Sequence, residues 1–280
     1  MLNFLLEPLG FEFMRNALLI GIFLGILCAV VGSYLIVQQM GMMGGVISHS
    51  VVPGLSIAFF LGLDLSLGAF IAGVLSALTV GAIQTRSRIK VDAAMALTLT
   101  TFLGFGVILI SLLKTNQVDL THILFGDILG IQPADVWHTL GITILVLILV
   151  KLFYKELLFY TFDPLGAKAS GLPVNSLYFG LICAITLTIV ASMQIVGVLL
   201  VMSLLVGPAI TAYLWVKELH EMMLLGAVIG AFSTVGGMYA SYYLDVPSGA
   251  AIVMAIFGCF LLTFLLRPIG NIIKNLIFKT

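Results

Sequence analysis

The feature that most constrains this chain is a series of nine apolar stretches, each long enough to cross a bilayer. About 20 helical residues span the hydrocarbon, and backbone polar groups in lipid are satisfied only in helices or closed barrels. The stretches lack the inside/outside alternation of barrel strands. The sequence therefore predicts an all-α fold, a polytopic transmembrane helical bundle. The predicted spans lie near residues 17–37, 43–63, 66–84, 93–113, 136–153, 175–193, 195–215, 222–242 and 247–266.

The composition supports the same class. Hydrophobic residues make up 61% of the chain and charged residues 9%, which a soluble domain with a polar surface could not carry. The charges of the 12 basic and 12 acidic side chains cancel, so the net charge does not indicate a nucleic-acid partner. Membrane lipid is the expected surrounding of the chain. We find no domain boundary, internal repeat or linker. Residues 1–280 are predicted to form a single transmembrane domain.

The orientation follows from the basic residues, which favour cytoplasmic loops. If alternate loops lie inside, every lysine and arginine except Arg15 and Lys114 falls on the cytoplasmic side. This arrangement puts the C-terminus inside and the N-terminus outside. The outer loop at 114–135 is predicted to hold a short helix around Thr121–Leu129, and the inner loop at 154–174 is predicted to hold another.

The inner loop carries clear signals for the ends of its helix. Asp163 can cap the N-terminus, Pro164 suits the first turn, and Gly171 followed by Pro173 can end the helix. The expected result is a short helix against the cytoplasmic face. Its exposed side is predicted to combine Leu165, Ala167, Lys168 and Ala169. Such a helix is either a capped connector or an element that enters a groove on another protein.

Deep inside the predicted spans, the one ionisable side chain other than cysteine and tyrosine is His49. Transporters driven by protons or sodium usually need intramembrane carboxylates, so the energy source is expected to lie outside this chain. A neutral imidazole is a good ligand for divalent transition-metal ions. It can equally form a hydrogen bond to a neighbouring helix, through Ser48 or Ser50. The residues alone leave both roles open.

Five segments, in this order and at this spacing, resemble the membrane permease subunit of the metal-ion ABC importer family, which moves manganese, zinc or iron(II) across bacterial inner membranes. They are MGMMGGVISHSVVPG at 40–54, LFGDILG at 124–130, DPLGAKASGLP at 163–173, VGVLLVMSLLVGPAITA at 196–212 and DVPSGAAI at 245–252. The resemblance implies a multi-pass protein of the inner membrane that works as a homodimer, with ABC ATPase subunits beneath it and an extracytoplasmic metal-binding protein that delivers the ion. It also implies that the helix at about 163–171 is the coupling helix that docks into the ATPase. The contact candidates are Asp163, Ala167, Lys168 and Gly171.

The resemblance implies that His49 is a transient metal site, paired with the His49 of a second copy. Where the family's acidic ligand is missing, Ser48, water, backbone carbonyls or groups of the second copy are candidate replacements. The family commonly has an acidic residue four positions before the histidine, one helical turn away, where this chain has Gly45. Gly45, Pro53 and Pro208 are candidates for gating or lining the pore, and Pro208 is expected to free a backbone carbonyl and kink its helix.

The predicted function is the membrane subunit of an ATP-driven importer for divalent transition-metal ions, with manganese favoured over zinc and iron(II). The chain has no GxxxxGK[ST] motif, so ATP is expected on a separate chain, and neither a resident cofactor nor an enzymatic activity is expected here. The alternative is a secondary transporter or channel that works alone. An intramembrane metalloprotease is disfavoured because one histidine without HExxH cannot build a three-ligand catalytic zinc site.

Overall fold

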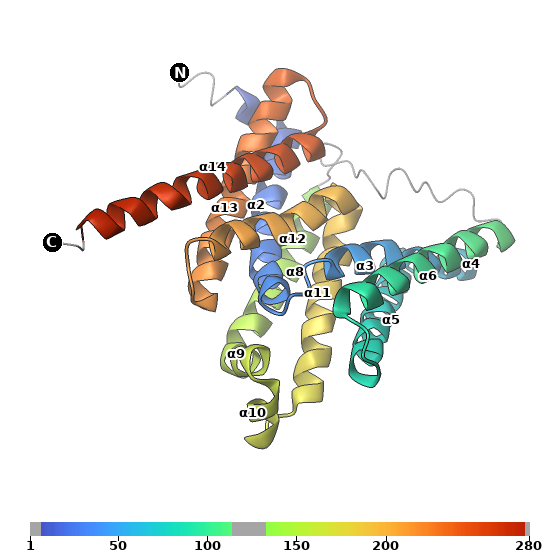
Figure 1. Cartoon of the computed structure of the whole chain (residues 1–280). Coiled ribbons are helices and arrows are strands. Elements are labelled where there is room, and N and C mark those ends of the chain that lie inside the picture. The colour runs from blue at the N-terminus through green and yellow to red at the C-terminus, as the bar shows by residue number, and fades with distance from the viewer. Residues whose placement is uncertain (1–6, 114–132, 278–280) are drawn as a thin grey trace.

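A computed structural model describes residues 7–113 and 133–277, and every regular element in those ranges is a helix (Figure 1). The predicted all-α fold is confirmed. The helix predicted around Thr121–Leu129 lies outside the described residues. The elements are η1 Pro8–Gly10, α2 Glu12–Val37, α3 Met43–Ser50, α4 Val52–Leu61, α5 Leu65–Arg86, α6 Val91–Leu112, α8 Pro133–Leu152, α9 Tyr154–Phe162, α10 Pro164–Ala169, α11 Val174–Val196, α12 Val198–Tyr213, α13 Leu219–Leu244 and α14 Ser248–Ile277.

The described part of the chain contains eight helical segments that are long and apolar enough to cross a membrane. The span predicted at 195–215 corresponds to α12, a helix of 16 residues. At 1.5 Å per residue α12 rises about 24 Å, less than the thickness of the hydrocarbon core. Gly197 separates α12 from α11. Its φ of +79° lies in a region that favours glycine, and the helical conformation of α11 ends there. The prediction therefore placed every long apolar segment, and α12 is the one that falls short of a full span.

The predicted span at 43–63 is divided into two helices, α3 and α4. The regular ladder of backbone hydrogen bonds stops after Ser50 and resumes where the Leu55 N–H donates to the Val51 carbonyl at 2.9 Å. Proline has no N–H, so Pro53 cannot donate to the carbonyl four residues before it, which belongs to His49. Pro53 instead occupies the first turn of α4, where its N–H is not needed. The division of this span therefore falls beside the candidate metal ligand.

The helices form two groups that share α11 (Figure 1). In one, the buried helix α2 packs against α12 and α13, with α14 on their other side. In the other, α3 and α4 pack against α5 and α6. Gly25 of α2 and Gly230 of α13 let two backbones meet, because a Cβ built on Gly25 would lie 2.8 Å from the Gly230 carbonyl carbon. Small residues at such crossings allow the close packing that stabilises helices in lipid.

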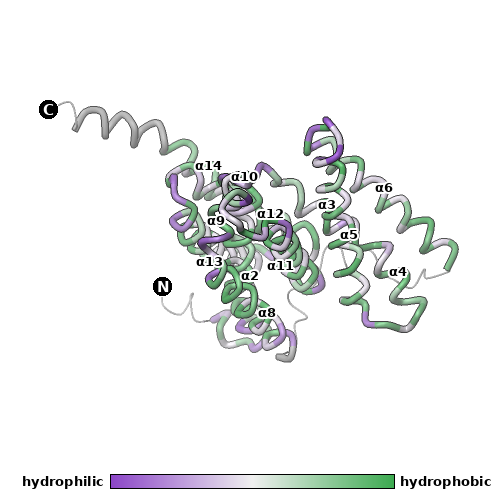
Figure 2. Tube along the Cα trace, turned by 90° about the horizontal axis from the view of Figure 1, so that it is seen from below, coloured by the Kyte–Doolittle hydropathy of each residue, from purple (hydrophilic) through white to green (hydrophobic). Residues whose placement is uncertain are grey.

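The outer surface of the bundle is apolar, as a lipid-facing surface requires. Most of the long helices are green, the hydrophobic colour, over much of their length in Figure 2, and the purple hydrophilic stretches are short. Large apolar side chains on α6, α8, α13 and α14 are exposed, among them Ile108, Ile148, Phe232 and Leu262. Burying such a surface in hydrocarbon removes it from water, so the membrane completes the fold.

Candidate functional site

The site begins with His49, near the C-terminal end of α3 and beside the break in the span. Its side chain is half-buried, whereas Ser48 and Ser50 on either side are buried, with 2% and 0% exposure. The hydroxyl oxygens of Ser48 and Ser50 have no hydrogen-bond partner within the described residues. A buried hydroxyl without a partner is costly, so these groups are available to a water or an ion. The predicted alternative was a hydrogen bond from the His49 imidazole to a neighbouring helix through Ser48 or Ser50, and among the described residues neither serine hydroxyl takes part in such a bond.

The backbone at His49 adds an oxygen to this set. Because Pro53 cannot donate to it, the His49 carbonyl lacks the hydrogen bond that an unbroken helix would supply. At membrane depth, freed carbonyls are tolerated where they are buried in protein or line a water-filled cavity. Carbonyl and hydroxyl oxygens are hard ligands of the kind that manganese and other hard cations accept, and imidazole suits iron and zinc. The break at Pro53 therefore leaves a carbonyl oxygen without its helical partner on the same residue that carries the imidazole.

The described part of the chain contains no group of three or more His, Cys, Asp or Glu side chains placed to hold a metal ion. At His49, the described residues of one copy thus offer a single imidazole and neutral oxygens, too few for a strong site. A weak site suits an ion that must leave as readily as it enters.

Gly45, one turn before His49, lies against α12. A Cβ built on Gly45 would come within 2.7 Å of the Met202 methyl carbon and 3.6 Å of its sulfur. Met202 therefore lies where the side chain of an acidic residue at this position would begin. Met202 was not predicted as a site residue, because nothing in the VLLVMSLL run distinguishes it from ordinary packing. Pro208, further along α12, is buried inside the helix.

The predicted inner-loop helix is present as α10, and its ends are built as the sequence predicts. The Gly166 N–H donates to Oδ1 of Asp163 at 2.8 Å, so Asp163 caps the N-terminus. At the other end, the N–H of Leu172 donates to the Ala167 carbonyl at 3.1 Å and the N–H of Gly171 to the Lys168 carbonyl at 3.1 Å. Gly171 has a φ of +86°, which makes this a Schellman motif.

One predicted surface residue of α10 is placed differently. Ala167 is fully buried, at 0% exposure, because it faces the rest of the chain rather than solvent. The prediction that it lies on the exposed side is wrong. Leu165 is the most prominent exposed side chain of α10, at 81%, and Lys168 and Ala169 are exposed beside it. A partner protein would therefore meet an apolar leucine flanked by a lysine.

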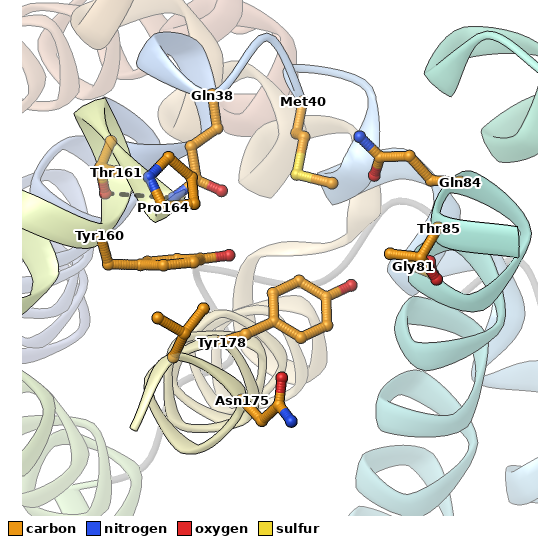
Figure 3. A pocket seen from close by; sticks show the side chains of 11 residues that line it. Gln38, Met40, Gly81, Gln84, Thr85, Tyr160, Thr161, Pro164, Asn175 and Tyr178 are labelled. Atoms are coloured by element: carbon orange, nitrogen blue, oxygen red, sulfur yellow. Dashed lines mark hydrogen bonds between the residues drawn. The ribbon is translucent and has the colours of Figure 1, made fainter. Parts of the chain in front are cut away.

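A cavity of about 490 Å³ lies beside α9 and α10 (Figure 3). It brings together the ends of α2 and α5 and the start of α11, with Gln38, Gln84, Thr85, Tyr160, Asn175 and Tyr178 among its lining residues. These helix ends lie on one side of the bundle. The distribution of basic residues predicts that this side is cytoplasmic. Burial raises the pKa of Tyr160, so the cavity wall there presents a neutral hydroxyl.

The opposite side of the bundle carries the turn between α4 and α5. Asp64 caps α5, with its Oδ1 accepting from the N–H of Ser66 at 2.7 Å and of Leu67 at 3.3 Å. These backbone hydrogen bonds hold the pKa of Asp64 below its ordinary value, because they favour the charged carboxylate. Close by, Gln194 near the end of α11 donates to the Ser66 hydroxyl at 3.0 Å.

A multi-pass helical bundle with a short capped helix exposed at one end and no GxxxxGK[ST] motif fits the class of ABC-transporter membrane subunits. The chain belongs to the family described as ABC 3 transport family, whose profile matches residues 10–267. The resemblance inferred from the five segments is confirmed, and the chain is a permease component rather than the ATP-hydrolysing one.

Curated relatives and a solved structure cover almost the whole chain. The manganese transport system membrane protein MntC of Halalkalibacterium halodurans is 40% identical over 262 residues, which cover 94% of this chain and 90% of MntC. The chelated iron transport system membrane protein YfeD of Yersinia pestis is 38% identical over 248 residues, which cover 89% of this chain and 83% of YfeD. The structure of PsaBC from Streptococcus pneumoniae in complex with Fab matches with a TM-score of 0.82 and 40% identity, covering 94% of each chain.

Proposed function

We propose that this chain forms half of a divalent transition-metal pathway in a bacterial inner membrane, as the permease subunit of an ATP-driven importer. Manganese is the first expected substrate, ahead of iron(II) and zinc. The observation that carries this proposal is membership of the ABC 3 transport family over residues 10–267, together with 40% identity to a manganese transport system membrane protein. The relative that is named for chelated iron transport keeps iron in the substrate class.

The proposed pathway passes His49. The imidazole, the freed His49 carbonyl and the unpartnered Ser48 hydroxyl supply one nitrogen and two oxygens from a single short segment. Two copies related by a two-fold axis would bring two such segments to one axis. The pair would then replace part of the hydration shell of the ion without a carboxylate, which favours passage over tight binding. Gly45 and Pro53 shape the proposed pathway. Gly45 allows α3 to lie close to α12, and Pro53 accompanies the break between α3 and α4.

In the proposed mechanism, α10 transmits the conformational change of the ATPase to the permease. Leu165 and Lys168 form the proposed contact with an ABC ATPase, and Asp163 and Gly171 fix the two ends of the helix. ATP binding by two ATPases would bring the two α10 helices together and alternate the access of the His49 pair between the two sides of the membrane. An extracytoplasmic metal-binding protein would supply the ion and select it.

The test is uptake by the complete complex in proteoliposomes, with manganese, iron(II) and zinc measured side by side. The His49→Ala variant should assemble normally and lose most ATP-dependent uptake. His138→Ala is the matched control, because His138 is exposed near the start of α8. Uptake by His49→Ala equal to that of the wild type would remove His49 from the pathway.

The alternative, a secondary transporter or channel that acts alone, is tested by vesicles that contain only the purified chain. Under the proposal they show no metal flux, with or without an ion gradient. Robust flux without the ATPase would replace the importer by this alternative. Such flux is not expected, because the spans hold no intramembrane carboxylate to couple an ion gradient.

A further inference from the structure

A side-chain hydrogen bond joins two segments that are 123 residues apart in the chain. The Gln38 amide nitrogen donates to the Thr161 hydroxyl oxygen at 3.2 Å, as the dashed line in Figure 3 marks. Gln38 is the residue that follows α2, and Thr161 lies in the last turn of α9. Asp163, the cap of the docking helix α10, is two residues beyond Thr161. The bond therefore ties the end of α2 to the segment that leads into α10.

This bond lies at the last turn of α9, where the helix borders open space. The first turn of α9 is held separately, by a hydrogen bond between the Tyr154 side chain and the backbone of His220. The cavity of about 490 Å³ adjoins one side of Thr161, and a second cavity of about 530 Å³, lined also by Phe162, Tyr213 and Lys217, adjoins it as well. Elsewhere α9 packs mainly against α8, α10 and α11. Open space on two sides leaves α9 and α10 room to move relative to α2. At this end of α9, the bond from Gln38 is a direct polar contact between the last turn of α9 and the end of α2.

Gln38 in turn opens a tightly bonded turn that ends at the His49 helix. The Gln38 N–H donates to the Tyr34 carbonyl at 3.0 Å, and the Met40 N–H donates to the Leu35 carbonyl at 2.7 Å. The Met43 N–H then donates to the Met40 carbonyl at 2.8 Å, at the first residue of α3. The first two bonds hold this turn to α2 and the third holds it to α3, so a displacement of Gln38 acts on a short turn that ends at the start of α3.

We propose that the Gln38–Thr161 hydrogen bond is the link through which movement of α9 and α10 reaches the helix that carries His49. The inference rests on the proposed function in one respect, namely that an ATPase moves α10. Gln38 and Thr161 are positioning residues, since neither is required to touch the ion. The link makes the end of α9 and the start of α3 move as one unit during the ATP cycle.

The first test measures that movement directly. Spin labels are attached at Met42→Cys and Phe162→Cys, two positions that are each 60% exposed, after the native Cys28, Cys183 and Cys259 are replaced by alanine. Labelled and unlabelled copies are mixed so that each complex carries one labelled copy. The distance between the labels should be the same in the nucleotide-free and ATP-bound complexes, and it should differ between those states when Gln38→Met is added. A distance that changes with the link intact, or one that stays constant in Gln38→Met, overturns the proposal.

The second test measures coupling. Gln38→Met and Thr161→Val keep the side-chain volume and remove the bond, so the number of ATP molecules hydrolysed per Mn²⁺ imported should rise about fivefold, as expected for losing one hydrogen bond. Thr161→Ser keeps the hydroxyl and should retain the wild-type ratio. Gln84→Met is the matched control, because Gln84 lines the same cavity without a hydrogen bond to α9. An unchanged ratio in both disruptive variants, or an equal rise in Thr161→Ser, rejects the link.

The two tests separate failure of the link from failure of the proposed function. If the wild-type complex imports no Mn²⁺, the manganese assignment fails, while the spin-label distances still decide whether the link transmits movement. If the wild type imports Mn²⁺ and the label distances contradict the link, the proposed function stands and the link is rejected.

Discussion

The crossing of α2 and α13 allows a stability prediction whose size can be worked from the structure. In Gly25→Ala, the new Cβ would lie 2.8 Å from the carbonyl carbon and 2.9 Å from the carbonyl oxygen of Gly230, and 3.0 Å from the Ala231 nitrogen. All three atoms belong to the backbone, so no side chain can turn away. Ordinary contact needs at least 3.4 Å, so the two helices must separate locally by roughly 0.6 Å.

Overpacking of this kind costs about 1 to 3 kcal/mol, and a gap of that size forfeits a quarter or more of each dispersion contact nearby. Alanine recovers about 0.5 to 1 kcal/mol because glycine is the poorer helix former. The net expectation for Gly25→Ala is a loss of up to about 2.5 kcal/mol. Gly236→Ala is the control in α13, since a Cβ there would meet no atom within 4 Å, and it should be neutral or slightly stabilising.

The assay is thermal unfolding of the purified chain in detergent, with the two variants and the wild type scanned at the same rate. Gly25→Ala should lower the midpoint temperature, and Gly236→Ala should leave it unchanged or raise it. If both variants shift the midpoint in the same direction by the same amount, the backbone contact at Gly25 does not limit the packing and the reasoning is wrong.

Three further predictions concern the docking helix, the outer turn and the metal pathway. Asp163→Ala removes the N-cap of α10, which costs about 1 kcal/mol, and Gly171→Val strains a backbone with φ of +86°, so both should reduce the amount of ATPase that co-purifies with the chain. Asp64→Ala should destabilise the chain at neutral pH. The difference in stability from the wild type should disappear as the pH falls through the lowered pKa of the folded carboxyl, because only the ionised carboxylate gains from the backbone hydrogen bonds. Unfolding midpoints measured across acidic pH check this. The double variant Gly45→Asp with Met202→Ala adds a hard carboxylate one turn from the histidine. It should lower the half-saturating concentration of Mn²⁺ for uptake relative to that of Zn²⁺. If the ratio of the two concentrations does not change, Gly45 lies outside the pathway.

The class of fold and the positions of the long helices could be read from the sequence, because lipid forces each apolar segment to satisfy its own backbone. The ends of α10 could be read as well. Asp163, Pro164 and Gly171 act through bonds within a few residues, so local chemistry is sufficient to predict them. The same holds for His49 as the one imidazole at membrane depth, which needs no knowledge of its neighbours.

Other features depend on contacts between segments that are far apart in the chain. Ala167 carries no signal that distinguishes a buried alanine from an exposed one, and only the packing of α10 decided that it faces inward. Met202 in α12 and Gly45 in α3 meet because two helices cross there. The bond between Gln38 and Thr161 spans 123 positions for the same reason.

The sequence alone therefore determined the membrane class, the positions of the long apolar segments and the short helix α10 with its caps, because these follow from hydropathy and short-range hydrogen bonding. Only the tertiary structure decided which side chains line the cavities beside α9, what fills the space next to Gly45 and which residue of α9 is bonded to the end of α2. The physical reason is that spans with similar apolar surfaces can pack in many ways, and the close approaches of particular backbones select one of them.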